Sequence, residues 1–277
     1  MRRNVVKAAL KSGSSQIGSW INIGDTFSTR LMARAGFPWL TVDMEHSPID
    51  WAQASVLFGF IADAGVVPLC RVPDGSHENI KRALDAGAWG IVAPMVDTVS
   101  QAKDIISACK YPPEGNRSIG GGSHFLSFGT SDAEYKEKAN GEILVVLQIE
   151  SPLGVENAEA IASLPGVDAL FVGPNDLKWQ TRKTLPGGRF PTPDEYSAQL
   201  ERVLAACKKG GIASGIHTFG IEDARDHVAR GFQLVAVQSD AGFLGAEATR
   251  YVSELAIVKE SSTSSNSAAA SGGLGKY

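Results

Sequence analysis

The chain has 277 residues, of which 43% are apolar, with a formal net charge of -4 and a pI near 5.8. This length is enough for one large hydrophobic core, and α/β barrels commonly use it as a single domain. The mild acidity argues against a basic surface for nucleic acid or an anionic membrane, and it leaves a small-molecule substrate open.

The three cysteines, Cys70, Cys109 and Cys207, show no paired spacing, which disfavours a disulfide framework or a zinc site. No secretory signal is recognisable in the first residues, and no apolar run approaches the ~20 residues of a membrane span. We therefore expect a cytoplasmic protein without membrane contact.

Taken in chain order, the sequence begins with an amphipathic stretch and then alternates short apolar runs with stretches of helical periodicity. The apolar runs are QIGSWINI, WLTVDME, VVPLCRV, WGIVAPMV, ILVVLQIE, ALFVGP, IASGIH and LVAVQSD. Eight such units predict an α/β fold with a closed (β/α)8 TIM barrel. An open doubly wound sheet is the alternative, but the first run lacks the G-x-G-x-x-G of a nucleotide site.

Two connections are longer than the others. Residues 112–140 come after the fourth run, and residues 177–193 come after the sixth. Long loops after barrel strands lie over the carboxyl-terminal mouth and are often lids. We therefore expect both segments over the mouth.

The end of the chain is rich in Ser, Ala and Gly. Such a composition cannot bury enough apolar surface to become ordered by itself. We expect one barrel domain with an N-terminal helix over residues 1–259, followed by a disordered tail over residues 260–277.

Polar side chains stand at the ends of six of the apolar runs. All strand ends of a parallel barrel converge on one mouth, so side chains far apart in the sequence are expected to form one cluster. A single polar residue at a strand end is usually a solvated turn, but six strands ending in this way favour a site. The residues are Asp43, Glu45, His46, Arg71, Gln148, Glu150, Asp176, His217 and Asp240.

Glu150 and Asp176 end consecutive runs, which are neighbours in a barrel. Adjacent carboxylates repel each other unless a cation lies between them, and Mg²⁺ prefers such ligands and keeps positions open for a substrate. Alternatively, each carboxylate only caps the following helix.

Arg71 can bind a carboxylate through two hydrogen bonds, and His46 is a natural general base. Together these residues predict a 2-oxo acid substrate that chelates the metal.

Six segments in order resemble the HpcH/HpaI aldolase family. They are VDMEH, CRVPDG, ALDAGAWGIVAPMVDT, YPPEGNRS, LQIES and FVGPNDL, and the resemblance spans about residues 10 to 255. The family includes 4-hydroxy-2-oxoheptanedioate aldolases, 2-keto-3-deoxy sugar acid aldolases and the fungal macrophomate synthase. The resemblance implies a class II aldolase on a (β/α)8 barrel, a hexamer that forms or cleaves 4-hydroxy-2-oxo acids through a metal-bound pyruvate enolate.

The resemblance also implies roles for single residues. His46 would be the catalytic base, and Arg71 would stabilise developing negative charge. Glu150 and Asp176 would bind the divalent metal, with Mg²⁺ preferred over Mn²⁺ or Co²⁺.

Further implied roles concern the substrate and the oligomer. Gln148 and the backbone around Asn175 would contact the oxo acid. Asp85 would reach the histidine of an adjacent subunit and raise its basicity, so that active sites are shared in a homo-oligomer. Asp43 and Glu45 would support the site by hydrogen bonding at the mouth and around the water shell of the metal.

The second substrate stays open because Lys178, Trp179 and Arg182 replace the small Ser-rich segment common in these aldolases. Oxaloacetate decarboxylation with enolate transfer, as in macrophomate synthase, would use the same residues. A phosphate-binding barrel would use the loops after the last two runs, but Asp240 there disfavours a phosphate. A scaffold without catalysis would show substitutions at the metal or arginine positions, and none is visible.

Overall fold

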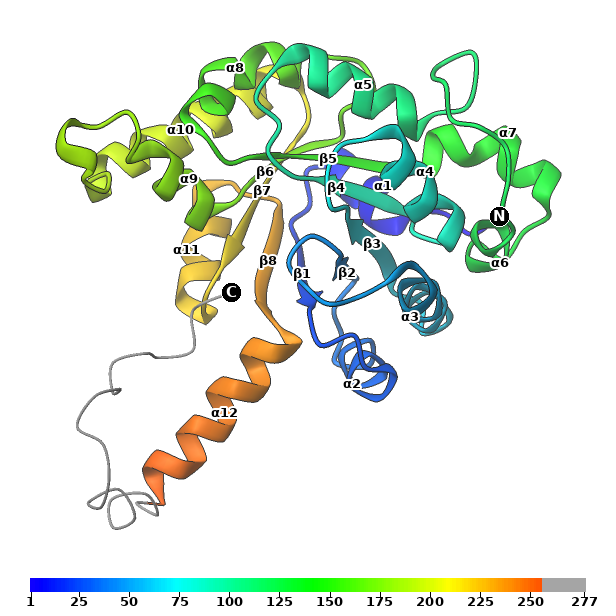
Figure 1. Ribbon diagram of the computed structural model, residues 1–277, viewed down its shortest axis with the longest axis horizontal. Coiled ribbons are helices and arrows are strands. Elements are labelled where there is room, and N and C mark those ends of the chain that lie inside the picture. Colours follow the sequence, from blue (N-terminus) through cyan, green and yellow to red (C-terminus); the bar gives the residue numbers. More distant parts are fainter. Residues whose placement is uncertain (256–277) are drawn as a thin grey trace.

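The computed structural model describes residues 1–255, so the predicted disordered tail and the domain boundary before it lie outside the described residues. Eight parallel strands form a closed barrel in which each strand pairs with the next and the last pairs with the first (Figure 1). This confirms the predicted TIM barrel. The strands are β1 (Gln16–Ile21), β2 (Trp39–Asp43), β3 (Val67–Arg71), β4 (Gly90–Ala93), β5 (Leu144–Ile149), β6 (Ala169–Val172), β7 (Ala213–Thr218) and β8 (Leu234–Ser239).

Helices surround the barrel and connect its strands. They are α1 (Val5–Lys11), α2 (Thr26–Met32), α3 (Trp51–Asp63), α4 (His77–Ala86), α5 (Val99–Cys109), α6 (Ser123–Ser127), α7 (Asp132–Glu142), α8 (Pro152–Ala162), α9 (Pro174–Thr181), α10 (Pro193–Gly210), α11 (Ile221–Arg230) and α12 (Asp240–Glu254), with a short 3₁₀ turn η1 (Pro186–Gly188). None of the helices in residues 1–255 is long and apolar enough to cross a membrane.

The helix ends agree closely with the sequence signals. Ser76 caps the start of α4 by accepting the backbone N–H of Asn79, and Thr98 forms a capping box with Gln101 at the start of α5. At the other end of α4, Gly87 takes the left-handed conformation with φ 116°. Such caps set where each helix stops and therefore where the next strand enters the barrel.

Every residue of β2, β4, β5 and β6 is buried, because one face of each strand fills the barrel and the other packs against helices. For this reason the corresponding runs of the sequence do not alternate between apolar and polar residues. Packing is tight enough that β1 passes the ring of Trp39 only because residue 18 is glycine: a Cβ there would lie 2.2 Å from the ring.

The long segment 112–140 does not lie over the mouth, so this expectation is wrong. Helix α5 stands between β4 and the segment, which therefore connects a helix to β5 at the amino-terminal end of the barrel. It contains α6 and most of α7, and it contacts the residues before α1, where the backbone N–H of Arg2 donates to the Phe128 carbonyl at 2.8 Å. By contrast, residues 177–193 do follow a strand, and α9 begins directly after β6.

Helix α12 extends away from the barrel (Figure 1). It is held at its start by contacts with β1, β8 and α2, and by the stacked rings of Phe37 and Phe243 at 6.3 Å. Further along, Leu244, Tyr251 and Val252 are exposed. The helix thus presents apolar side chains that its own barrel does not cover.

The close approach at Gly18 predicts a large packing cost for one methyl group. Gly18→Ala places a Cβ 2.6 Å from the Trp39 carbonyl oxygen as well as against the ring, so the strands must separate. We expect a loss of about 1–3 kcal/mol in the free energy of unfolding, measured by urea denaturation. The matched control is Gly59→Ala in α3, where nothing lies within 4 Å of the added Cβ. It should stabilise by about 0.5–1 kcal/mol through helix propensity; equal effects at both positions would contradict the packing argument.

Candidate active site

An ion pair between Asp43 and Arg71 lies at the mouth, where β2 and β3 end side by side. Arg71 donates from Nε to Oδ1 at 2.8 Å and from Nη2 to Oδ2 at 2.6 Å, which is the two-pronged geometry that suits a carboxylate. The Asp43 side chain is fully buried, and that of Arg71 is 14% exposed. The pair therefore fixes the guanidinium while leaving part of it accessible.

The pKa values of this pair depend on its contacts. Burial alone would raise the pKa of Asp43, but the hydrogen bonds and charge of Arg71 outweigh it, and the pKa is lowered. Burial alone would lower the pKa of Arg71, but Asp43 and Glu45 raise it. Both groups stay charged at neutral pH.

Glu45 and His46 are positioned by the same carboxylate. Their backbone N–H groups donate to Asp43 Oδ1 at 3.1 Å and 3.3 Å, which closes the turn after β2. Glu45 Oε2 lies 3.3 Å from Arg71 Nη1, and Glu45 Oε1 lies 3.6 Å from His46 Nε2. The His46 side chain is 52% exposed, so it can meet a substrate or water at the mouth.

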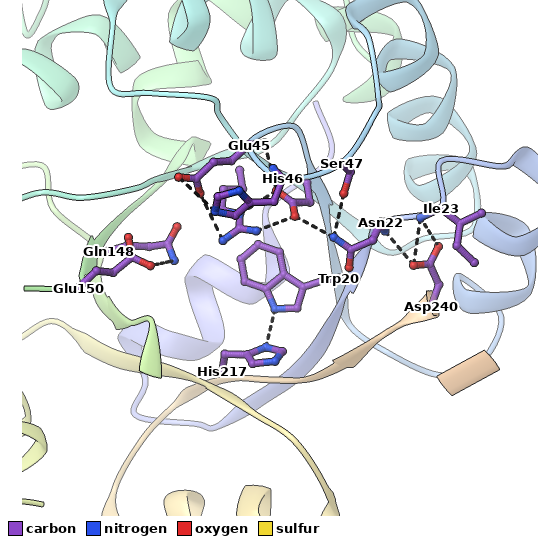
Figure 2. A network of polar contacts seen from close by, with 12 residues as sticks. Trp20, Asn22, Ile23, Glu45, His46, Ser47, Gln148, Glu150, His217 and Asp240 are labelled. Carbon is purple, nitrogen blue, oxygen red and sulfur yellow. Dashed lines mark hydrogen bonds and ion pairs between the residues drawn. The ribbon is translucent and has the colours of Figure 1, made fainter. Parts of the chain in front are cut away.

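Two residues that the sequence analysis did not identify complete this cluster (Figure 2). Asn22 donates from Nδ2 to Asp43 Oδ2 at 2.7 Å and to Ser47 Oγ at 2.9 Å. The ring of Trp20 lies 4.7 Å from the guanidinium carbon of Arg71. Asn22 directly follows β1, so the rule that polar side chains at strand ends mark the site would have found it.

Glu150 forms the second part of the site, at the end of β5. Its Oε2 accepts the backbone N–H of Met95 at 3.0 Å, and its Oε1 accepts from Gln148 Nε2 at 3.1 Å. Met95 has φ 52°, an uncommon conformation for a residue with a side chain and one often found at functional sites. Gly173 makes room for the carboxylate, since a Cβ there would lie 2.0 Å from Oε1.

Burial and neighbouring carboxylates outweigh the effect of Arg71 on the pKa of Glu150. Burial raises its pKa to about 7, and the nearby carboxylates of Asp176 and Glu45 add to this effect. Burial also raises the pKa of Glu45, with Asp43 and Asp176 contributing. These oxygens therefore gather negative charge that a hard divalent cation would neutralise.

The carboxylate oxygens of Glu45, Glu150 and Asp176 fit a divalent cation better than a softer metal. Within residues 1–255 no group of three or more His, Cys, Asp and Glu side chains is arranged as a complete metal site. A metal here would thus have few protein ligands and open positions. The buried Gln148 Oε1 has no hydrogen-bond partner among the described residues, and it could accept from a bound molecule.

Asp176 and Asn175 lie in the first turn of α9, directly after β6. Asp176 is close enough to Glu150 and Glu45 to act on both pKa values, so the structure brings the two predicted metal ligands together. Asp240, by contrast, accepts the backbone N–H groups of Asn22 and Ile23. It ties β8 to the turn after β1.

Asp85 lies at the opposite end of the barrel from the mouth, because α4 ends one residue later and β4 begins only at Gly90. Its Oδ1 accepts from Arg117 Nη2 at 2.8 Å, and the Arg117 side chain is fully buried. Within one chain Asp85 is therefore remote from His46. Its predicted role at an adjacent subunit stays a prediction.

The sequence profile of a family described as HpcH/HpaI aldolase/citrate lyase matches residues 16–245, which include every mouth residue described above. The chain belongs to this family. A hydroxypyruvate/pyruvate aldolase of Chromohalobacter salexigens is 36% identical over 91% of the chain and 97% of its own length. A 5-keto-4-deoxy-D-glucarate aldolase of Escherichia fergusonii is 38% identical over 86% of the chain and 91% of its own length.

Solved structures of the HpcH/HpaI family have the same fold. A family protein from Burkholderia cenocepacia J2315 superposes with a TM-score of 0.83 at 33% identity, covering 91% of this chain and 99% of the other. Macrophomate synthase superposes with a TM-score of 0.74 at 25% identity, covering 90% and 89%. The resemblance stated from sequence is thus confirmed, and the protein is a lyase of the HpcH/HpaI aldolase family.

The raised pKa of Glu150 predicts a specific pH dependence in a sample treated with chelator. The folded chain keeps the proton up to about pH 7, whereas the unfolded chain releases it near the ordinary value of 4.5. The unfolded chain then binds fewer protons between these values, so the free energy of unfolding falls as the pH rises through this window. Glu150→Gln should remove up to about 3 kcal/mol of that fall.

The measurement is urea denaturation of both proteins at pH 5 and pH 7.5 with chelator present. Asp240 and Glu45 also have raised pKa values. They titrate in both proteins, so the difference between wild type and variant reports Glu150 together with its effect on the titration of Glu45. Parallel pH profiles for the two proteins would show that Glu150 is ionised throughout.

Proposed function

We propose that the protein is a divalent-metal-dependent carbon–carbon lyase, a class II aldolase that cleaves or forms 4-hydroxy-2-oxo acids through a pyruvate enolate. The observation that carries this proposal is the placement of Glu150, with Asp176 close by, at the mouth that also holds a guanidinium fixed by Asp43. The names of the relatives support pyruvate or hydroxypyruvate as the 2-oxo acid.

Glu150 and Asp176 would hold the cation, for which Mg²⁺ is the first choice and Mn²⁺ or Co²⁺ are alternatives. When bound, it would act as a Lewis acid on the substrate and offset developing negative charge. Met95 and Gln148 keep Glu150 oriented through their hydrogen bonds. Gly173 keeps the space in front of its Oε1 free.

Arg71 would stabilise the negative charge that develops on the 2-oxo oxygen as the carbon–carbon bond breaks. Its orientation is already set by Asp43, so little reorganisation is needed during the reaction. Gln148 Oε1 and the backbone around Asn175, at the amino-terminal end of α9, would contact the oxo acid.

His46 would be the general base, because it is the accessible imidazole beside this cluster. In the cleavage direction it takes the proton of the C4 hydroxyl, directly or through a water molecule. The C3–C4 bond then breaks to give an aldehyde and the pyruvate enolate, and a proton returned to C3 yields pyruvate. In the synthetic direction the same steps run in reverse.

The second substrate depends on the segment after Asp176. Trp179 is 57% exposed and meets Phe190 edge to face at 5.0 Å, and the guanidinium carbon of Arg182 lies 4.6 Å from the Trp179 ring. These bulky groups would limit which aldehyde can approach.

A homo-oligomer, with the hexamer as the first choice, would complete the site. Asp85 is remote from the mouth of its own chain, and it would act on His46 of an adjacent subunit. The apolar side chains of α12 that stand clear of the barrel, among them Leu244 and Val252, offer surface for a second copy. The cysteines are free and buried, which suits a reducing cytoplasm.

The first test is pyruvate release, coupled to lactate dehydrogenase, from 4-hydroxy-2-oxo acids and from oxaloacetate. We expect release from the hydroxy-oxo acid with Mg²⁺, Mn²⁺ or Co²⁺, and none with chelator. Glu150→Ala should lose metal binding and at least about a hundredfold in kcat/KM, as losing a key electrostatic group does. Retention of both by this variant would refute the proposal, and pyruvate from oxaloacetate alone would favour decarboxylation with enolate transfer.

A second test addresses the shared site. His46→Ala and Asp85→Asn should each be nearly inactive, but mixed oligomers of the two should regain activity, because some sites then combine an intact histidine with an intact aspartate. The control is a mixture of His46→Ala with Arg71→Ala, in which every site carries a defect of its own chain. Equal activity in both mixtures, or a fully active monomer in sedimentation, would contradict the shared site.

A further inference from the structure

Trp20 contacts two polar residues at the mouth. The Arg71 guanidinium lies over its ring, and Figure 2 shows His217, on β7, beside its indole nitrogen. Its indole Nε1 donates to His217 Nδ1 at 2.9 Å. Its ring meets Phe171 edge to face at 6.0 Å, and only 5% of Trp20 is exposed. The indole therefore has a fixed position beneath the guanidinium.

The contact with Trp20 determines the tautomer of His217. An indole N–H can only donate, so Nδ1 must be the unprotonated, accepting nitrogen, and the ring proton of the neutral imidazole is on Nε2. Burial and the charge of Arg71 lower the pKa of His217 to about 4, so the acceptor stays available at neutral pH.

This arrangement leaves a polar group unsatisfied. His217 Nε2 is buried and has no hydrogen-bond partner among the described residues. Phe219 packs on the ring at 4.8 Å, so an apolar residue would suit the space at least as well. An unmade buried hydrogen bond costs stability. The presence of histidine is therefore better explained by the acceptor that it offers to Trp20.

The geometry of Arg71 indicates what this acceptor achieves. The two hydrogen bonds to Asp43 fix the guanidinium within its plane, and Glu45 Oε2, 3.3 Å from Nη1, is the polar contact that acts against a tilt about the line that joins them. The Trp20 ring, 4.7 Å away, blocks that tilt on one face. Such a block is effective only while the indole itself cannot swing.

We propose that His217 is a positioning residue for the aldolase reaction, which holds the indole of Trp20 by its hydrogen bond and thereby fixes the tilt of Arg71. The inference rests on the proposed function in one respect, namely the role of Arg71 in stabilising negative charge. His217 itself is not required to touch the substrate.

The test compares two replacements of His217 that differ in the acceptor. His217→Leu removes it, whereas His217→Asn places an amide oxygen near the position of Nδ1. We expect His217→Leu to lower kcat about five- to tenfold, the effect of one lost hydrogen bond, with KM for the oxo acid changed less than twofold. His217→Asn should recover most of that loss.

The pairwise link is tested by a double-mutant cycle with Trp20→Phe, which removes the donor. In the Trp20→Phe background, His217→Leu should cost little further kcat, because the hydrogen bond is already absent. Trp89→Phe is the matched control: it removes an indole hydrogen bond to Ser127 at 2.8 Å, but at the start of β4, away from the mouth. It should lower thermal stability and leave kcat within twofold.

Equal losses of kcat for the leucine and asparagine variants, or independent effects in the cycle, would overturn the inference. No pyruvate chemistry in the wild-type protein would instead refute the proposed function. Wild-type activity that is unaffected by His217→Leu would refute the positioning role alone.

Discussion

The ion pair between Asp43 and Arg71 is the interaction on which the rest of the mouth depends. The same carboxylate accepts the guanidinium, the amide of Asn22 and the backbone N–H groups of Glu45 and His46. The carboxylate of Asp43 thereby sets the orientation of the Arg71 guanidinium and the turn that carries His46. Because Asp43 is fully buried, loss of Arg71 would leave an uncompensated charge in the barrel.

Some features of the barrel mouth lower the stability of the folded protein. Glu150 is buried with a pKa raised to about 7, and Met95, whose backbone N–H donates to this carboxylate, has a positive φ. Burial of a carboxyl group and a positive φ at a residue with a side chain both cost free energy. Their concentration at the carboxyl ends of the strands distinguishes the candidate site from the other end of the barrel.

The two ends of the barrel also explain which sequence-based expectations were correct. The apolar runs were recognised as strands because residues buried on both faces need no polar alternation. Segment 112–140 was expected at the mouth because it comes after the fourth strand. However, α5 lies between that strand and the segment, so the segment lies at the amino-terminal end of the barrel. Trp20 was missed because a tryptophan in an apolar run is indistinguishable from a core residue until its neighbours are known.

The sequence by itself determined the strand–helix alternation, the barrel and the chemistry available at the strand ends, since hydrophobic periodicity and residue type are local properties. It also carried the family resemblance. Only the tertiary structure decided which polar residues meet. Asp240 ties the turn after β1, Asp85 faces the other end, and Trp20 links Arg71 to His217 across the barrel. The physical reason is that these contacts join elements far apart in the sequence, and the contacts of Trp20 depend on the register of β1, β3 and β7, which no local pattern records.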